Sequence, residues 1–212
     1  MKSSKPGGGE KLEALANLDP YLTFSIFAVI GLATFRLGMD TRLLIIWLVL
    51  LGLCLIYAEG QDIAMQYGLA NMGRGAVVGL VLSLPLLLFA KDALKTTSLR
   101  FFPLTSQAVL FQNLVLLAAP IEELYFRGIL QREKGLIVAA LLYGLAEGII
   151  VLPGVSGYPV VLIAVLIAMA LLGFLYGYVY QRYGLSASVS CHATVNAILL
   201  FLPSALDTWL AT

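Results

Sequence analysis

Charged residues are scarce in this chain of 212 residues, since lysine, arginine, aspartate and glutamate together make up only 12% of it. Hydrophobic residues make up 60%, and the mean hydropathy is +0.95. A water-soluble domain of this length cannot bury so much apolar surface, so the composition excludes a soluble enzyme or binding module. The formal net charge is +1 and no long basic run is present, which argues against a nucleic-acid partner.

Cysteine and histidine are also rare. Cys54 and Cys191 are the only cysteines, and both lie within apolar runs, so they indicate neither a disulfide framework nor a cysteine-based zinc site. The first twenty residues are polar and lack the basic, apolar and small-residue layout of a cleaved signal peptide. We therefore expect a polar tail at 1–20, with Asp19 and Pro20 as the N-cap and first residue of the first spanning helix.

Long apolar runs dominate the rest of the chain. A helix needs roughly 20 mostly apolar residues to cross a bilayer, and continuous runs favour helices over the alternating strands of a barrel. The predicted spans are 21–38, 42–59, 71–90, 104–131, 135–152, 158–180 and 185–203. The fold class is therefore predicted to be all-α, a polytopic transmembrane bundle of about seven or eight helices that forms one domain over 21–212.

Two details qualify this prediction. The fourth run is long enough to be split near Pro103 or Pro120, whereas the prolines and glycines of VLPGVSGYP predict a clear turn between the fifth and sixth spans.

Lysine and arginine near the span ends favour a cytoplasmic N-terminus by a small margin, with Arg42 on the outer side. We expect a multi-pass protein of the cell (inner) membrane.

A few polar residues within the apolar runs stand out as candidates. A charged side chain at the bilayer centre costs about 3 kcal/mol, so such residues are functional candidates by default. They are Glu122, Glu123, Arg127, Glu147, His192 and Asn196.

Helical spacing groups these residues on three faces, because positions four apart lie on the same side of a helix. Glu123 pairs with Arg127 in this way, Tyr143 precedes Glu147, and His192 precedes Asn196. Glu122 and Glu123 differ by about 100° around the axis, so one carboxylate can pair with Arg127 while the other faces elsewhere. The alternative interpretation of the Glu123–Arg127 pair is a buried ion pair that only fixes helix packing.

Three carboxyl groups, one arginine and one histidine cannot all be neutralised in pairs. At least one carboxyl group should therefore stay protonated or meet water or a metal ion. A carboxylate held in this way is suited to act as a general base toward water. His192 could carry a proton and the Asn196 amide could stabilise a developing oxyanion.

These motifs resemble those of the CPBP family of CAAX proteases and bacteriocin-processing membrane proteins, also called the Abi family, which includes the type II CAAX prenyl endopeptidases. The EExxxR motif stands as Glu122, Glu123 and Arg127, and the HxxxN motif as His192 and Asn196; the resemblance covers about residues 105–203. The middle motif of the family is an aromatic residue followed four positions later by histidine. Here Tyr143 is followed by Glu147.

The resemblance implies an intramembrane endopeptidase that hydrolyses a peptide bond of a membrane-associated protein or peptide. By matched position, Glu122 would activate water, Glu123 and Arg127 would hold the site together, His192 would transfer a proton, and Asn196 would stabilise the oxyanion. Glu147 could act as a proton donor.

A carboxylate-rich site of Glu122, Glu147 and His192, with Glu123 beside it, could alternatively hold a divalent metal such as zinc. Because Glu147 stands where the family has a histidine, the chain could alternatively be a catalytically inactive member of that family. Such a chain would bind a membrane-protein partner as a chaperone, assembly factor or structural subunit. A transporter or channel is disfavoured by the lack of repeated broken-helix patterns in two halves.

Overall fold

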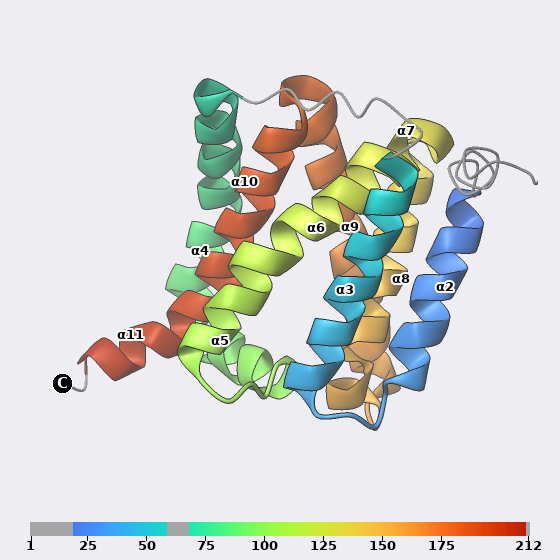
Figure 1. Cartoon of the computed structure of the whole chain (residues 1–212). Helices are drawn as coiled ribbons and strands as arrows, with labels where there is room; N and C mark the ends of the chain where they lie inside the picture. Colours follow the sequence, from blue (N-terminus) through green and yellow to red (C-terminus); the bar gives the residue numbers. More distant parts are fainter. Residues whose placement is uncertain (1–18, 59–67, 211–212) are drawn as a thin grey trace, which may run out of the picture.

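The computed structural model describes residues 19–58 and 68–210, which are helical almost throughout and contain no strand (Figure 1). Six helical runs within these residues are long and apolar enough to cross a membrane. The prediction of an all-α, multi-span bundle is therefore confirmed. The helices are α2 (Pro20–Ala33), α3 (Met39–Ala58), α4 (Leu69–Phe101), α5 (Gln107–Phe111), η1 (Gln112–Ala118), α6 (Ala119–Glu123), η2 (Leu124–Leu130), α7 (Gln131–Lys134), α8 (Leu136–Val155), α9 (Pro159–Tyr183), α10 (Leu185–Asn196), η3 (Ala197–Phe201) and α11 (Leu202–Leu210).

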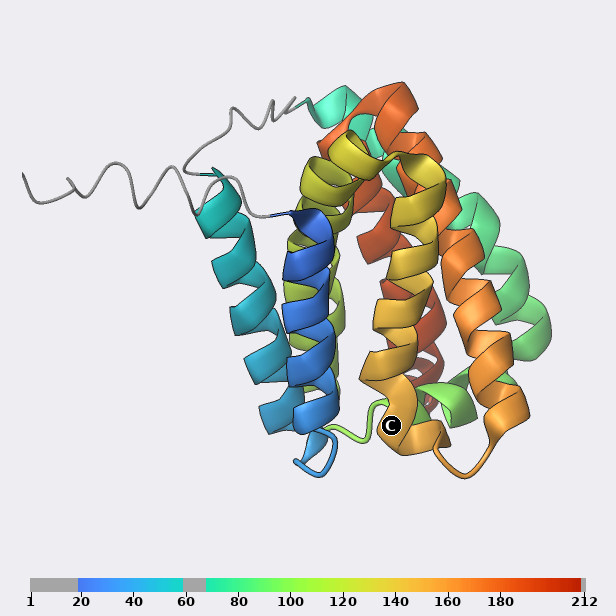
Figure 2. The same ribbon diagram turned by 90° about the vertical axis from the view of Figure 1, so that its right-hand side faces the viewer.

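The first predicted span is shorter than expected. Asp19 caps α2 by accepting a hydrogen bond from the Tyr21 backbone N–H at 2.9 Å, and this bond, aided by Lys134, holds the pKa of the Asp19 carboxyl below its usual value. The helix has 14 residues and ends at Ala33, about 21 Å from its start at 1.5 Å per residue. The prediction of a span over 21–38 is therefore wrong in length; α2 packs beside α3 at one edge of the bundle (Figure 2).

The third predicted span, 71–90, is the first part of a longer helix. Ala90 departs from helical geometry (φ −134°, ψ 24°), and beyond it α4 turns across the lower end of the bundle in Figure 1. We call residues 91–101 the crossing segment. Ser98 Oγ donates to the Leu200 carbonyl at 2.7 Å, and Arg100 Nε donates to the Gly154 carbonyl at 3.1 Å. The crossing segment therefore bridges the ends of two spans that carry polar motif residues.

The fourth predicted span is one helical run over Gln107–Lys134. The chain leaves α4 just before Pro103 and restarts at the Ser106 N-cap, as the predicted break near Pro103 requires. The alternative break at Pro120 is not found. Pro120 has no backbone N–H to donate, and the wide π-helical turns of η1 and η2 before and after α6 let the helix continue past it.

Glycines permit the close helix contacts that place the polar residues. A Cβ on Gly75 of α4 would collide with the Ala187 carbonyl of α10, and a Cβ on Gly173 of α9 would lie 2.8 Å from the Tyr143 ring of α8. Small residues at such crossings let spanning helices approach closely. The predicted turn after α8 is also confirmed, because α8 ends at Val155 and α9 begins at Pro159.

Candidate active site

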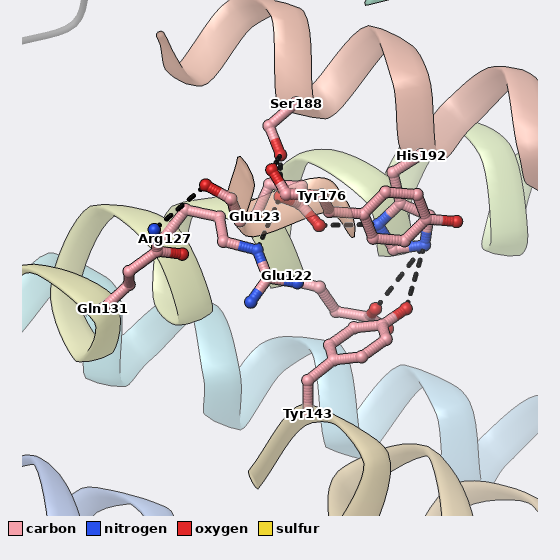
Figure 3. Close-up of polar contacts among 9 residues, drawn as sticks. Glu122, Glu123, Arg127, Gln131, Tyr143, Tyr176, Ser188 and His192 are labelled. Carbon is pink, nitrogen blue, oxygen red and sulfur yellow. Dashed lines mark hydrogen bonds and ion pairs between the residues drawn. The ribbon is translucent and has the colours of Figure 1, made fainter. Parts of the chain in front are cut away.

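The predicted polar residues come from three neighbouring helical runs. Glu122, Glu123 and Arg127 lie on the α6–η2 run, Glu147 lies on α8, and His192 lies on α10. All five side chains are buried, with Glu147 the most exposed at 9%. Figure 3 shows the α6–η2 and α10 groups facing one another within the bundle.

Glu123 is the most heavily bonded of the carboxylates. Its Oε2 accepts from Arg127 Nε at 3.1 Å, and its Oε1 lies 3.0 Å from His192 Nδ1. Ser188 Oγ donates to the same carboxylate. Because an ionised carboxylate only accepts hydrogen bonds, Nδ1 of His192 carries a proton and donates it to Glu123. Glu123 therefore sets the orientation of the imidazole ring.

The His192 ring is held from a second side by Tyr176. The two rings stack with centroids 4.6 Å apart and planes inclined by 16°. The other ring nitrogen, Nε2, lies 3.3 Å from the Tyr143 hydroxyl and 3.8 Å from Glu122 Oε2. With Nδ1 protonated in a neutral ring, Nε2 is an acceptor, so it is available to take up a proton.

Glu122 has a different environment from its neighbour. Its Oε2 has no hydrogen-bond partner among the residues that the structure describes, and its carboxyl lies within hydrogen-bonding reach of Glu147. The predicted division is therefore found: Glu123 faces Arg127, whereas Glu122 points away from that ion pair.

A small cavity lies against these groups. It has a volume of about 140 Å³, and its lining includes the motif residues Glu122, Glu147 and Asn196 together with Tyr143 and Tyr176. Most of the remaining wall is apolar, and Leu94, Thr97 and Phe101 of the crossing segment form part of it. The polar groups therefore face a largely apolar space that can admit water or a side chain.

Asn196 has one amide N–H already engaged, since Nδ2 donates to the Leu114 carbonyl at 2.8 Å. Leu114 lies in the π-helical stretch η1, where the hydrogen-bond pattern of an α-helix is interrupted. The other N–H of the Asn196 amide is the one that could serve a ligand in the cavity.

The predicted metal site finds no support in the arrangement of the donors. Among residues 19–58 and 68–210, no group of three or more His, Cys, Asp or Glu side chains is placed to hold a metal ion. The His192 nitrogens face Glu123 on one side and Tyr143 with Glu122 on the other. The side chains as they stand do not fit a metal, and zinc binding stays a prediction.

Two residues of the site were not among the predicted ones. Ser188 lies four positions before His192 and so shares its helical face, a spacing that could have identified it. Tyr176 comes from α9, and nothing in the sequence connects it with His192. Both hold other groups in place, Ser188 at Glu123 and Tyr176 at the imidazole.

Comparison with known proteins agrees with the site. The family model described as type II CAAX prenyl endopeptidase Rce1-like matches residues 104–198, a range that contains both complete motifs and the Tyr143–Glu147 pair. No curated protein and no solved structure matches the chain. The matched range agrees with the resemblance over about 105–203, so this part of the chain is similar to the CAAX proteases of the CPBP family.

Proposed function

We propose that this chain is an intramembrane endopeptidase that hydrolyses a peptide bond of a membrane-associated protein or peptide in the cell (inner) membrane. The match of residues 104–198 to a membrane-protease family supports the reaction class. The observation that carries the proposal is the contrast between two adjacent glutamates. Glu123 is fully engaged by hydrogen-bond donors, whereas Glu122 faces the cavity with one carboxylate oxygen unbonded.

Glu122 is the general base in this proposal. A water molecule in the cavity gives a proton to the Glu122 carboxylate while its oxygen bonds to the peptide carbonyl carbon. The second N–H of Asn196 donates to the oxygen that becomes negative. When the C–N bond breaks, the departing amine takes a proton from the site, directly from Glu122 or through His192 Nε2.

The remaining residues keep this geometry. Glu123 accepts from His192 Nδ1 and so leaves Nε2 free to accept a proton, while Arg127 balances the Glu123 charge. Two carboxyl groups that face one small apolar cavity share a proton more readily than both ionise. A proton shared between Glu147 and Glu122 is then available to the departing amine.

A metal-dependent variant of this proposal makes a separate prediction. Glu122, Glu147 and His192 would have to rearrange to hold a divalent ion such as zinc, which would then supply Lewis-acid chemistry. No step above passes through such an ion. Sensitivity of cleavage to a chelator, with recovery on adding zinc back, distinguishes the two chemistries.

A second candidate function rests on Glu147. It stands where the family motif has a histidine, and a carboxylate cannot supply the positive charge of an imidazolium. A member without catalysis would use the same cavity and bundle to bind a transmembrane partner as a chaperone, assembly factor or structural subunit. The two functions differ in whether Glu122 is needed for turnover.

The deciding experiment measures cleavage of quenched-fluorescent membrane peptides by the purified full chain in detergent and in liposomes. The variant is Glu122→Gln, and Glu133→Gln is the matched control because Glu133 is an exposed residue of the nearby α7 helix. Loss of a general base should lower kcat by about 10²–10⁴-fold, while the control stays near wild type.

Equal cleavage by Glu122→Gln and wild type would rule out Glu122 as the base. If the wild type is inert over the peptide panel while Glu147→His cleaves, the chain is a catalytically inactive member. The second candidate function would then replace the first.

A further inference from the structure

The Tyr143 ring is held in place by contacts on several sides. Its ring meets Phe126 edge-on with centroids 5.2 Å apart, and the Arg127 guanidinium lies over it at 5.1 Å from the centroid. Gly173 on α9 leaves no side chain between its own helix and the ring. The ring therefore has one available position, which determines where the hydroxyl lies.

The Tyr143 hydroxyl is directed at the reacting groups of the proposed site. It lies 3.3 Å from His192 Nε2, and Figure 3 shows it beside the Glu122 carboxylate. Tyr143 also lines the cavity, so a substrate there can touch it. A phenylalanine would fill the same volume without placing a polar group in this apolar wall.

Two of the polar groups at the cavity present acceptors. Glu122 presents an acceptor, and His192 Nε2 is an acceptor when Nδ1 donates to Glu123. Asn196 has one N–H left after its bond to Leu114. An oxygen that becomes negative during attack on a peptide carbonyl needs preorganised donors. Tyr143 adds a hydroxyl donor that lies 3.3 Å from His192 Nε2, beside the group proposed to activate water.

We infer that Tyr143 is a further catalytic residue, which donates a hydrogen bond to the substrate carbonyl oxygen as that oxygen becomes negative; this inference rests on the proposed hydrolytic function. Before attack, the hydroxyl donates to His192 Nε2. It then turns about its C–O bond toward the oxyanion and retains its own proton throughout. Tyr143 and Asn196 together form an oxyanion hole of two neutral donors.

The proton and electron balance of the step is complete without any other reactant. Water gives one proton to Glu122 as its oxygen bonds to the carbonyl carbon, and the carbonyl π electrons move to the oxygen that Tyr143 contacts. On collapse, those electrons restore the C=O bond, the C–N bond breaks, and the amine takes the proton from Glu122. The products are one carboxylic acid and one amine.

Tyr176 is the other tyrosine of the site, and its geometry assigns it a different role. Its ring is stacked nearly parallel to the His192 imidazole, and its backbone carbonyl lies 2.9 Å from Ser188 Oγ. It is therefore a positioning residue. Tyr143 instead meets the imidazole edge-on, at 86°, with its hydroxyl toward the ring nitrogen.

The test compares Tyr143→Phe with Tyr125→Phe in the full chain. Tyr125 is equally buried and its hydroxyl lies 2.9 Å from Thr23 Oγ1, on the side of α2, so the same atom is removed away from the cavity. Tyr143→Phe should lower kcat by about 10²–10³-fold with KM changed by less than about threefold, as expected for loss of an oxyanion-hole donor. Tyr125→Phe should keep kcat within about twofold of wild type.

A second measurement separates chemistry from packing. A phosphonate peptide that imitates the tetrahedral intermediate should bind Tyr143→Phe more weakly by about the same factor as kcat/KM falls, while the uncleaved peptide should bind unchanged. Undiminished kcat in Tyr143→Phe, or equal losses in both variants alongside equal falls in unfolding temperature, would overturn the inference but leave the protease proposal standing. An inert wild type would instead remove the proposed function on which the inference rests.

Discussion

Two arginines are completely buried in this bundle, and they serve different purposes. Arg127 on η2 and Arg42 on α3 both have 0% exposed surface. Arg127 is paired with the Glu123 carboxylate beside the imidazole of the site. Among the residues that the structure describes, Arg42 bonds to backbone atoms: it donates to the carbonyls of Gly31 and Ile149, at 2.9 and 2.6 Å, and to that of Ile150. One arginine belongs to the polar site, and the other joins three helices.

The partners of Arg42 are available for local reasons. Pro153 has no N–H, so the carbonyl of Ile149, four positions earlier in α8, has no helical donor. Gly31 lies in the last turn of α2, where carbonyls turn to side-chain donors, and its carbonyl accepts from Thr34 Oγ1 at 3.2 Å as well as from Arg42. The Arg42 side chain therefore supplies a donor to each helix.

This difference qualifies a common inference about membrane proteins. A charge buried among spanning helices is a functional candidate by default, because it is expensive to place there. Arg127 agrees with that rule by its position in the site. Arg42 shows that backbone carbonyls can also stabilise a buried charge. The partner of a buried charge therefore indicates its role better than its depth does.

The largest loss of stability should follow from Arg127→Leu. Removing one partner of a buried ion pair leaves the Glu123 charge uncompensated, which should cost about 3–5 kcal/mol of unfolding free energy. The fraction that stays folded should cleave peptides about 10²-fold more slowly, because Glu123 no longer holds His192 in place. Denaturant titration in mixed micelles, with cleavage normalised to folded monomer, measures both quantities.

The double variant Arg127→Leu with Glu123→Gln serves as its control. Neutralising the carboxylate should restore much of the lost stability without restoring cleavage. Recovery of full cleavage in the double variant would show that this ion pair only fixes helix packing, which is the structural interpretation left open by the sequence.

A smaller effect, confined to stability, is expected for Arg42→Leu. The variant leaves the Ile149 carbonyl without its arginine donor and the Gly31 carbonyl with Thr34 Oγ1, which should lower the unfolding free energy by about 2–3 kcal/mol. The rate of cleavage per folded molecule should stay within about twofold of wild type, since Arg42 touches none of the motif residues. A tenfold loss in that normalised rate would contradict the contrast with Arg127.

Much of this organisation follows from simple patterns in the chain. Continuous apolar runs predicted the spans, because the hydrocarbon core of a bilayer favours apolar helices. The spacing of four between Glu123 and Arg127 predicted their ion pair. The spacing also predicted that Glu122 would face elsewhere. These successes share one cause: each depends on geometry within a single helix.

Features that depend on contacts between helices were missed or wrong. Arg42 was predicted as a flanking charge on the outer side of a span, but its side chain enters the bundle to meet α2 and α8. The crossing segment lies outside the predicted spans, yet its apolar positions Leu94 and Phe101 line the cavity. Tyr176 likewise reaches His192 only through the packing of α9 on α10.

The smallest expected effect tests the explanation given for Arg42. In Pro153→Ala the new backbone N–H can donate to the Ile149 carbonyl, so Arg42 becomes less necessary. The cost of Arg42→Leu, measured by denaturant titration as before, should therefore be about 1 kcal/mol smaller in the Pro153→Ala background than in wild type.

Pro85→Ala is the matched control for this cycle, because Pro85 also lies inside a helix, α4, but is absent from the contacts of Arg42. Its effect should add to that of Arg42→Leu within about 0.5 kcal/mol. Additivity in the Pro153 cycle as well would mean that Arg42 does not compensate for the proline. The arginine would then stabilise the bundle chiefly through the end of α2, where it donates to the Gly31 carbonyl whether or not α8 contains a proline.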